Sequence, residues 1–408
     1  MTSQQRTPRL LTINVGSSSL KAVLYRLGPA ETVEVRASAE RIGTPPSSLR
    51  IADAQGTELL SRSDALPDHA AALGALCTWL RAQRLDEGLR AVGQRVVHGG
   101  REYSAPTLIT DTVLDALRSL VSLDTEHLPQ ALRVIESVRQ AYPSLPQVAC
   151  FDTAFHRRMP RVAQLYPLPR DLWDAGVARY GFHGLSCEYI LQELRALDGA
   201  AADGRVIVAH LGHGASLTAV HHGVGVDTTM GLTPTGGLVM STRTGDLDPG
   251  VLLYLLETRG LDPAALSRLV NKEGGLLAVS GGSADMQDLL AREAADPRAA
   301  EAVALFCYQA RKSLGALVAA LGGLDTLVFT AGIGQHAAVI RARICDGLEY
   351  LGLRVDAARN AEHAPIISGA ASRVVVRVIP TDEDLVIARH TRRVIAEEGG
   401  DHGDRDRV

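Results

Sequence analysis

A pair of apolar runs joined by a turn of small residues occurs twice in the chain, and this repeat constrains the fold more than any other feature. The first copy comprises Leu10–Val15, Gly16–Ser19 and Leu20–Tyr25, and the second comprises Val206–Leu211, Gly212–Ser216 and Leu217–Val220. Short apolar runs around a turn of glycine and serine are typical of β-hairpins. Two hairpins separated by about half the chain predict two related lobes, each with a turn whose backbone N–H groups can bind an anion.

Length and composition agree with two domains. The chain has 408 residues, well above the roughly 250–300 residues at which a single core stops growing. Hydrophobic residues make up 46% of the chain, which excludes disordered and collagen-like proteins. Lys and Arg number 42 against 46 Asp and Glu, a formal net charge of -4. Nucleic-acid backbones need a basic face, so we expect no nucleic-acid partner, although a small anion can still be bound locally.

Cysteine usage and terminal composition favour a cytoplasmic protein. The five cysteines are scattered and form no Cys-x-x-Cys pair, which fits neither a zinc ribbon nor a disulfide framework. Met1–Arg9 is polar and does not have the pattern of a leader. The most apolar later stretch, Leu314–Leu324, is shorter than the about 20 residues that cross a bilayer. We therefore expect a soluble protein in a reducing compartment, with no membrane partner.

Strand-like and helix-like segments alternate between and after the hairpins. Helices are expected around 70–83, 110–120, 128–141, 299–321 and 384–398, and strands around 91–97, 148–152 and 324–330. Residues 399–408 are expected to form a frayed tail. This alternation predicts an α/β fold. In such folds ligands bind beyond the carboxyl ends of the strands, so we look for chemistry there.

Three small-residue turns follow apolar strands, at 16–19, 212–216 and 332–334. The chain has no P-loop, no dinucleotide fingerprint and no Gly-x-Ser-x-Gly motif. One such turn alone would be an ordinary tight turn. The three together, with Lys21 just past the first, favour binding of phosphate groups by backbone N–H groups from more than one side.

Two arginines and one histidine lie in settings that suit anion binding. Arg95 ends an apolar strand before Gly99-Gly100, and Arg243 lies in a loop rich in Thr, Gly and Asp. Either could be a solvated surface group, but both settings favour a guanidinium fork for carboxylate or phosphate. His183 stands between glycines and is a candidate functional residue. His210, His213, His221 and His222 could be read as metal ligands, but the two strands beside a turn send them in different directions, so we expect no zinc site.

Carboxylates at strand ends have two interpretations. Asp152 and Asp384 could each cap the helix that follows, because Asp before an apolar-periodic run is a good N-cap. For Asp384 we keep this interpretation. Glu383 could instead reach Mg2+, which proteins hold with one or two carboxylates, waters and substrate phosphates.

Eight motifs, in order and over nearly the whole chain, resemble those of the acetate kinase family, within the larger acetate and sugar kinase, Hsp70 and actin group. They are Asn14–Lys21, Arg95–Gly100, Phe151–His156, Arg179–Gly184, His210–Ser216, Thr242–Pro249, Phe329–Gly334 and Thr381–Leu385.

The resemblance implies an α/β fold of two duplicated ribonuclease H-like, actin-like ATPase lobes with a ligand cleft between them. It places an N-terminal lobe at 1–152 with the C-terminal helix at 386–408, and a nucleotide-binding lobe at 153–385. It also implies a homodimer.

The resemblance further implies a phosphotransferase that moves a phosphoryl group reversibly from ATP to acetate, giving acetyl phosphate and ADP with Mg2+ or Mn2+. Asn14 and Glu383 would position the metal. The catalytic residues would be Asp152, His183 and Arg243. The acid would be bound by Arg95, with Val97, Phe182 and Pro234 around its methyl group. The nucleotide residues would be Lys21, His210, Leu211, Gly212, His213, Gly214, Asp285, Met286, Gln287, Gly332, Ile333, Gly334, Gln335 and His336.

Asp152 is hard to explain as a base. A carboxylate substrate has a pKa near about 4 and is already ionised at neutral pH, so the nucleophile needs no proton removed. We therefore expect Asp152 to orient an arginine or the substrate.

Several positions depart from the family pattern and leave alternatives open. His213 stands where the family has Asn, Gln287 replaces Arg, and Gln335-His336 replaces Glu-Asn. A different phosphoryl donor such as pyrophosphate therefore stays open. Near the acid site, Glu126 and Leu128 flank His127 where the family has an apolar residue and Asn, respectively. Cys187 also replaces a frequent His, and Thr235-Gly236 replaces a bulkier Leu-Glu pair. Propionate or another short-chain acid is thus a second possibility. An inactive nucleotide-binding scaffold is the non-enzyme alternative.

Overall fold

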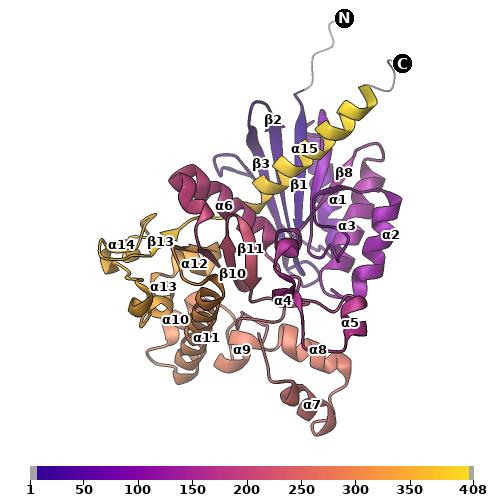
Figure 1. Cartoon of the computed structure of the whole chain (residues 1–408). Helices are drawn as coiled ribbons and strands as arrows, with labels where there is room; N and C mark the ends of the chain where they lie inside the picture. Colours follow the sequence, from indigo (N-terminus) through magenta and orange to yellow (C-terminus); the bar gives the residue numbers. More distant parts are fainter. Residues whose placement is uncertain (1–6, 404–408) are drawn as a thin grey trace, which may run out of the picture. The chain divides into compact units, whose positions relative to one another are not determined.

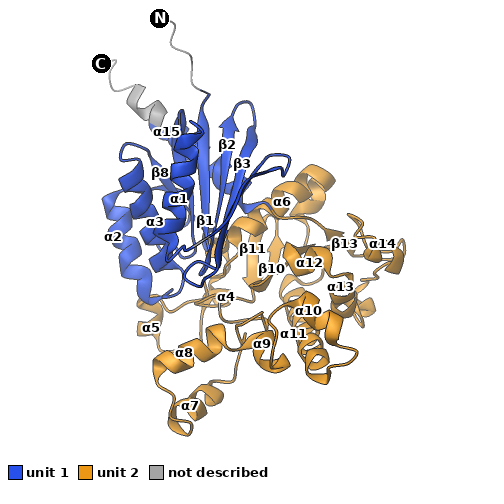
Figure 2. Cartoon of the chain, turned by 180° about the vertical axis from the view of Figure 1, so that it is seen from behind, with its two compact units in different colours: residues 1–154, 382–408 blue, residues 155–381 orange. Residues whose placement is uncertain are grey.

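The computed structural model of the chain describes residues 7–403 (Figure 1). The part of the expected frayed tail at 404–408 lies outside the described residues, whereas 399–403 continue the last helix. The chain divides into two compact units (Figure 2). Unit 1 contains the residues up to Ala154 and those from Asp382 onward, and unit 2 contains Phe155–Thr381. The domain limits expected from the sequence, 152/153 and 385/386, stay a prediction.

Unit 1 is built on an eight-stranded sheet in the order β5-β4-β3-β2-β1-β6-β8-β7. Its strands are β1 (Arg9–Val15), β2 (Ser19–Leu27), β3 (Glu31–Glu40), β4 (Ser47–Asp53), β5 (Glu58–Asp64), β6 (Leu89–Val96), β7 (Thr107–Leu108) and β8 (Gln147–Phe151). β1 and β2 pair antiparallel, which confirms the first predicted hairpin. β1, β6 and β8 are parallel neighbours, so their carboxyl ends meet at one edge of the sheet.

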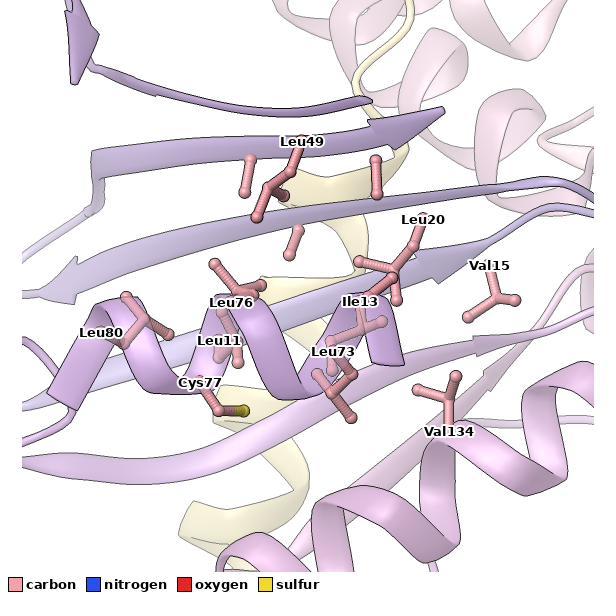
Figure 3. Close-up of a cluster of buried hydrophobic side chains, with 14 of the residues drawn as sticks. Leu11, Ile13, Val15, Leu20, Leu49, Leu73, Leu76, Cys77, Leu80 and Val134 are labelled. Atoms are coloured by element: carbon pink, nitrogen blue, oxygen red, sulfur yellow. The ribbon is translucent and has the colours of Figure 1, made fainter. Parts of the chain in front are cut away.

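Helices cover both faces of this sheet. They are α1 (His69–Ala82), α2 (Asp111–Ser119), α3 (Leu128–Ala141) and α15 (Glu383–Gly403), with a short 3-10 helix η1 (Leu120–Ser122). Leu11 and Ile13 of β1 pack with Leu73 and Leu76 of α1 in one buried cluster (Figure 3). Leu10 packs with Ala388 of α15 in another cluster. Because side chains alternate along a strand, Thr12 and Asn14 share the α15 face with Leu10.

Unit 2 repeats the central part of unit 1. Its strands are β9 (Val206–Leu211), β10 (Ala215–His221), β11 (Val224–Thr228), β12 (Thr326–Thr330) and β13 (Val375–Val378). Their order, β11-β10-β9-β12-β13, matches β3-β2-β1-β6-β8, and β9, β12 and β13 are likewise parallel neighbours. β9 and β10 form the second predicted hairpin. The prediction of an α/β fold with two duplicated lobes is confirmed.

The helices of unit 2 are more numerous than those of unit 1. α6 (Gly184–Asp198) packs on Val206 and Val208 of β9, and α11 (Pro297–Leu321) packs on β10 and β11. The other α-helices are α4 (Arg161–Gln164), α5 (Arg170–Asp174), α7 (Pro249–Glu257), α8 (Pro263–Lys272), α9 (Gly275–Ser280), α10 (Met286–Arg292), α12 (Ala331–His336), α13 (Ala338–Cys345) and α14 (Ala357–Ala361). Short 3-10 helices are η2 (Ala154–Arg158), η3 (Gly199–Asp203) and η4 (Glu349–Leu351).

The expected turn at 332–334 is wrong, because α12 begins at Ala331 immediately after β12. Ala331 has a φ of +63°, in the left-handed region, and this single residue carries the chain from strand into helix. Gly332, Ile333 and Gly334 therefore lie in the first helical turn. The three small-residue segments do not share one local structure.

The chain passes from one unit to the other between the last strand of a sheet and the long helix that follows it. After β8 of unit 1, the next long helix is α6, which belongs to unit 2. After β13 of unit 2, α15 returns to unit 1. In each unit, the helix that begins beside the hairpin therefore follows, along the chain, the last strand of the other unit.

Two further properties concern membrane-spanning helices and the cysteines. Within residues 7–403, no helix combines the length and apolar character that crossing a membrane requires. All five cysteines are free thiols and all are buried.

Gly93 of β6 allows α15 to approach the sheet closely. A methyl group at this position would lie 2.2 Å from Thr391 Oγ1 and 2.7 Å from Ile387 Cγ2. We expect Gly93→Ala to lower the free energy of unfolding by about 1–3 kcal/mol, because α15 must move or strain.

Gly74→Ala is the matched control for this measurement by urea unfolding. Gly74 lies in α1, where an added methyl group would meet nothing within 4 Å, so the change should stabilise by up to about 1 kcal/mol. A Gly93→Ala variant as stable as the wild type would contradict the close packing of α15.

Candidate functional site

Polar side chains of β1 meet the beginning of α15 in unit 1. Asn14 Nδ2 donates to Glu383 Oε2 at 3.2 Å, and Thr12 Oγ1 donates to Asp384 Oδ1 at 3.2 Å. Both β1 residues lie on the face that α15 covers. Lys21 is the β2 partner of Asn14 in the sheet register and is exposed.

Arg95 and Asp152 form a buried ion pair where the parallel strands β6 and β8 end. Arg95 Nε donates to Asp152 Oδ2 at 3.0 Å, and Nη2 contacts the same oxygen. The Arg95 side chain is 15% exposed and that of Asp152 is fully buried. Arg95 Nη1 also donates to Asn14 Oδ1 at 3.2 Å. The structure therefore brings Asn14, Arg95, Asp152 and Glu383 together, with Asp152 bound to an arginine rather than capping a helix.

The surroundings of Arg95 are strongly acidic. Burial alone would lower the pKa of Arg95, but the charges of Asp152, Glu383 and Asp124 raise it above its usual value. The guanidinium therefore stays charged. Its Nη1 edge, which faces Asn14, lies away from the oxygen that Asp152 contributes.

The expectation that Asp384 caps the last helix is wrong. Asp382 is the residue whose Oδ1 accepts from the helical N–H of Leu385, at 3.0 Å, whereas Asp384 lies inside the first turn and binds Thr12. The helix begins at Glu383, one residue earlier than expected, and its capping residue lies two residues before Asp384. Burial, together with the charges of Glu383 and Asp382, raises the pKa of Asp384 to about 6.

These residues fit a magnesium site completed by other ligands. Among the residues that the structure describes, no group of three or more His, Cys, Asp and Glu side chains could hold a metal. Mg2+ is commonly held by one or two carboxylates, waters and substrate phosphates. Glu383 supplies such a carboxylate beside Asn14. The pKa of Asp384 is raised first by burial and then by the charges of Glu383 and Asp382, and a bound cation would offset those charges.

In unit 2, two histidines stack beside the second hairpin. His183 is the residue before α6 and has a φ of +59°, in the left-handed region. Its ring stacks on His210 of β9 with a centroid distance of 4.0 Å and an interplanar angle of 16°. His183 Nδ1 lies 2.9 Å from Ser216 Oγ, and His210 Nδ1 lies 2.8 Å from Ser186 Oγ. The glycines around His183 gave no sign of this stacking in the sequence.

Arg243 and His183 converge on Gly214 in the hairpin turn. A methyl group at Gly214 would lie 3.3 Å from His183 Nε2 and 3.4 Å from Arg243 Nη1. Arg243 Nη1 also donates to the carbonyl of Pro234 at 3.1 Å. Two nitrogen-bearing side chains are thus placed beside a backbone segment without a side chain of its own, which is a suitable arrangement for binding an anion.

The segment before Arg243 is held by backbone hydrogen bonds. The N–H of Leu276 in α9 donates to Met240 O at 2.8 Å, and the N–H of Gly274 donates to Thr242 O at 3.0 Å. The N–H of Ser241 donates to the carbonyl of His213 at 3.4 Å. Burial and then the charge of Arg243 lower the pKa of His213, so this ring favours its neutral form.

Residues expected to bind nucleotide have varied local roles. Asp285 caps α10 by accepting from the N–H groups of Gln287 at 2.8 Å and Asp288 at 3.0 Å. Met286 is buried and Gln287 is exposed. Leu211 is fully buried, and His336 and Gly332 are exposed.

Arg341, which the motifs did not indicate, supports the end of α12. Its guanidinium is fully buried and donates to the carbonyls of Gly334 at 2.9 Å and Gln335 at 2.7 Å, and to Asn360 Oδ1 at 2.8 Å. An arginine that follows the glycine-rich segment Gly332–Gly334 at some distance along the chain carries no distinctive sequence signal. Only the packing of α12, α13 and α14 reveals it.

The residues expected around the methyl group of the acid are buried, but they belong to different units. Val97 lies in unit 1, and Phe182 and Pro234 lie in unit 2. His156 Nε2 lies 2.8 Å from the carbonyl of Phe182 and fixes that segment. Their shared role stays a prediction.

The acidic residue coupled to Arg95 near His127 is Asp124, which the motifs did not single out. Asp124 Oδ1 lies 3.1 Å from both the backbone N and Nδ1 of His127. Burial would raise the pKa of Asp124, but the hydrogen bonds and charge of His127 lower it, so the carboxylate is ionised.

Comparison with known proteins adds to this geometry. The model of the acetokinase family matches residues 9–389. An acetate kinase of Rhodopseudomonas palustris is 46% identical over 394 residues, covering 94% of this chain and 98% of that protein. The crystal structure of Porphyromonas gingivalis acetate kinase has a TM-score of 0.86 and 35% identity, covering 95% and 100% of the two chains. A propionate kinase from Francisella tularensis has a TM-score of 0.89 and 34% identity, covering 95% and 99%.

The raised pKa of Asp384 predicts a pH-dependent gain in stability on Asp384→Asn. The ionised carboxylate destabilises the folded state above about pH 6, and this penalty vanishes below about pH 4, where the group is protonated in both states. In magnesium-free buffer, the variant should exceed the wild type in free energy of unfolding by about 1–3 kcal/mol at about pH 8 and match it near pH 4.

Urea unfolding at the two pH values measures this difference. Asp115→Asn is the control, because Asp115 is a largely exposed carboxylate of the same unit. A wild type more stable than Asp384→Asn at the higher pH would rule out the crowded acidic environment.

Proposed function

The chain belongs to the acetokinase family, and on this premise we propose that it catalyses the reversible, magnesium-dependent transfer of the γ-phosphoryl group of ATP to acetate, giving acetyl phosphate and ADP. Membership of the family confirms the resemblance seen in the sequence. The observation that carries the proposal is the convergence of His183 and Arg243 on Gly214, which suits a phosphoryl group in transfer.

The reaction does not need a general base. A carboxylate oxygen of acetate attacks the γ-phosphorus, the new P–O bond forms, and the bond to ADP breaks with its electron pair leaving on ADP. Because the carboxylate is already ionised at neutral pH, no proton has to be removed. The obstacle is the repulsion between an anion and a polyphosphate, so catalysis rests on positioning and on positive charge.

We assign the acid to Arg95. Its Nε and Nη2 are used by Asp152, which fixes the plane of the guanidinium. Nη1 donates to Asn14 Oδ1 at 3.2 Å and to the carbonyl of Val15 at 3.4 Å. The second N–H of Nη2, which Asp152 does not use, is therefore the donor that we assign to a carboxylate. In this assignment Asp152 is a positioning residue and takes no part in proton transfer. Val97, Phe182 and Pro234 are assigned to the methyl group of the acid.

We assign the phosphoryl group in transfer to His183 and Arg243. The loose transition state spreads charge over the equatorial oxygens, and two donors beside Gly214 would match that charge. We assign four parts of the chain to the nucleotide. They are the hairpin segment His210–Gly214, Lys21, the α12 residues Gly332–Gly334 with Gln335 and His336, and Asp285–Gln287.

We assign Mg2+, or Mn2+ in its place, to Glu383 with Asn14. When bound, the metal would neutralise charge on the phosphates. Thr12 of β1 donates to the neighbouring Asp384 and so holds the first turn of α15 against β1.

Two alternatives keep specific support. A propionate kinase is among the similar structures, and Glu126 departs from the family pattern, so another short-chain acid is the second candidate substrate. Gln287 and Gln335 supply no charge where the family pattern has charged residues, which keeps pyrophosphate as a second candidate donor. An inactive scaffold is disfavoured, because it would need neither Arg95 nor Arg243.

We further propose a cytoplasmic homodimer. Five buried free thiols suit a reducing compartment. The exposed apolar side chains of α7, Val251, Leu253 and Tyr254, with the neighbouring Leu247, offer a surface that a second copy could cover.

Trapping of acyl phosphate with hydroxylamine tests the function directly. Acetate, propionate and butyrate are each incubated with ATP, GTP or pyrophosphate and Mg2+, and the acyl hydroxamate is measured. We expect the highest yield with acetate and ATP. Failure of all nine combinations would exclude both enzyme candidates.

Arg243→Ala should lower kcat by on the order of 10³ with the fold intact, as removal of an arginine from a phosphoryl-transfer site does. Arg268→Ala is the matched control, because Arg268 is an exposed arginine of the same unit that pairs with Glu273. We expect the control to keep wild-type turnover. A loss below tenfold in folded Arg243→Ala protein would remove this residue from the mechanism.

A further inference from the structure

The stacked pair of His183 and His210 is held by two buried serines, one for each ring. Ser216 is fully buried on β10 and lies directly opposite His210 in the register of the β9–β10 pair. Cross-strand partners carry their side chains on the same face. Ser216 thus lies on the same face as His210. Its hydrogen bond, however, is to the other ring of the pair, with Oγ 2.9 Å from His183 Nδ1.

The second serine, Ser186, contacts the ring of His210 and has one further hydrogen-bonding partner. Its Oγ donates to Thr381 Oγ1 at 2.9 Å. A serine hydroxyl has a single proton, so with that proton directed to Thr381 the oxygen accepts from Nδ1–H of His210. This contact places the His210 ring proton on Nδ1.

The requirement on His183 is the opposite one. Its Nε2 is the atom beside Gly214 and Arg243. Phosphoryl oxygens only accept hydrogen bonds, so His183 must carry a proton on Nε2 to contact one. A hydroxyl that donates to Nδ1 selects this tautomer.

We propose that Ser216 is a positioning residue that donates its hydroxyl proton to Nδ1 of His183 and so holds this ring as the Nε2-protonated, neutral tautomer. A hydroxyl can donate only to a nitrogen without a proton, so this contact makes the His183 ring neutral. The stacking agrees, because a charge on both rings at once would be unfavourable with centroids 4.0 Å apart. Ser186 sets the complementary tautomer of His210. The inference rests on the proposed function for the role of Nε2, but the tautomer itself does not depend on it.

Nitrogen-15 NMR of the full chain labelled in histidine reads the tautomer directly, since protonated and unprotonated ring nitrogens have separate signals. In the wild type we expect the His183 proton on Nε2 and the His210 proton on Nδ1. His183→Gln assigns the His183 signals. A wild-type His183 with its proton on Nδ1 overturns the proposal without any Ser216 variant.

Ser216→Ala should convert His183 to a mixture of tautomers and lower kcat by about ten- to a hundredfold, with little change in the KM values for acid and ATP, because the lost interaction acts on the transition state. Ser216→Thr keeps the hydroxyl and should restore the wild-type tautomer and most of the turnover. An unchanged tautomer and an unchanged kcat in Ser216→Ala would overturn the assignment.

Two control variants separate positioning from a general loss of packing. Thr218→Ala removes a fully buried hydroxyl from the same face of β10, where it bonds Thr228, and should leave both tautomers and kcat unchanged. Ser186→Ala should alter the His210 signals alone. If His183 follows Ser216 as expected but no acyl phosphate forms with any acid or donor, the proposed function fails and the tautomer assignment stands.

Discussion

A buried ion pair between Arg95 and Asp152 joins the carboxyl ends of β6 and β8, and the remaining polar groups of unit 1 are arranged around it. Asp152 is fully buried, and a buried charge left without its partner costs several kcal/mol, roughly 3–5 kcal/mol for a broken pair. The pair therefore holds both strand ends in place. The same guanidinium extends to Asn14, and Asn14 reaches Glu383 at the start of α15.

The duplication gives each unit one polar position that faces an incoming helix. In unit 1 this residue is Asn14, two positions before Gly16, and it contacts Glu383 in the first turn of α15. In unit 2 it is His210, two positions before Gly212, and it contacts Ser186 in the first turn of α6. The same hairpin thus presents an amide to acidic residues in one unit and an imidazole to a hydroxyl in the other. The shared five-strand arrangement supports different chemistry because the side chains differ at both the strand position and the helix position.

Local patterns predicted the two hairpins and the helices α1, α2, α3, α11 and α15, but not α6 or the shorter helices of unit 2, and the roles of the polar site residues stay a prediction. Apolar alternation and turn residues decide those features within a short segment. The sequence predicted a turn at 332–334 instead of the helix α12, because a left-handed Ala331 starts that helix directly and propensity does not favour this conformation for alanine. The sequence did not indicate Asp382 as the cap, because the helix start depends on a contact with a distant segment, in which Thr12 of β1 binds Asp384 inside the first turn. Ser216 could have been found from the hairpin register, which places it opposite His210, whereas Asp124 and Arg341 depend on contacts between distant segments.

The central claim is that Asp152 holds Arg95 in place for the acid and is not a base. The most direct measurement is the pH dependence of kcat/KM for acetate in the wild type and in Asp152→Asn, from about pH 6 to about pH 9. If Asp152 positions Arg95, the variant should raise the KM for acetate and lower kcat/KM by a similar factor at every pH, because a substrate that is already ionised needs no base. A wild-type profile with a pH-dependent limb that disappears in Asp152→Asn would contradict this account and assign proton transfer to the carboxylate.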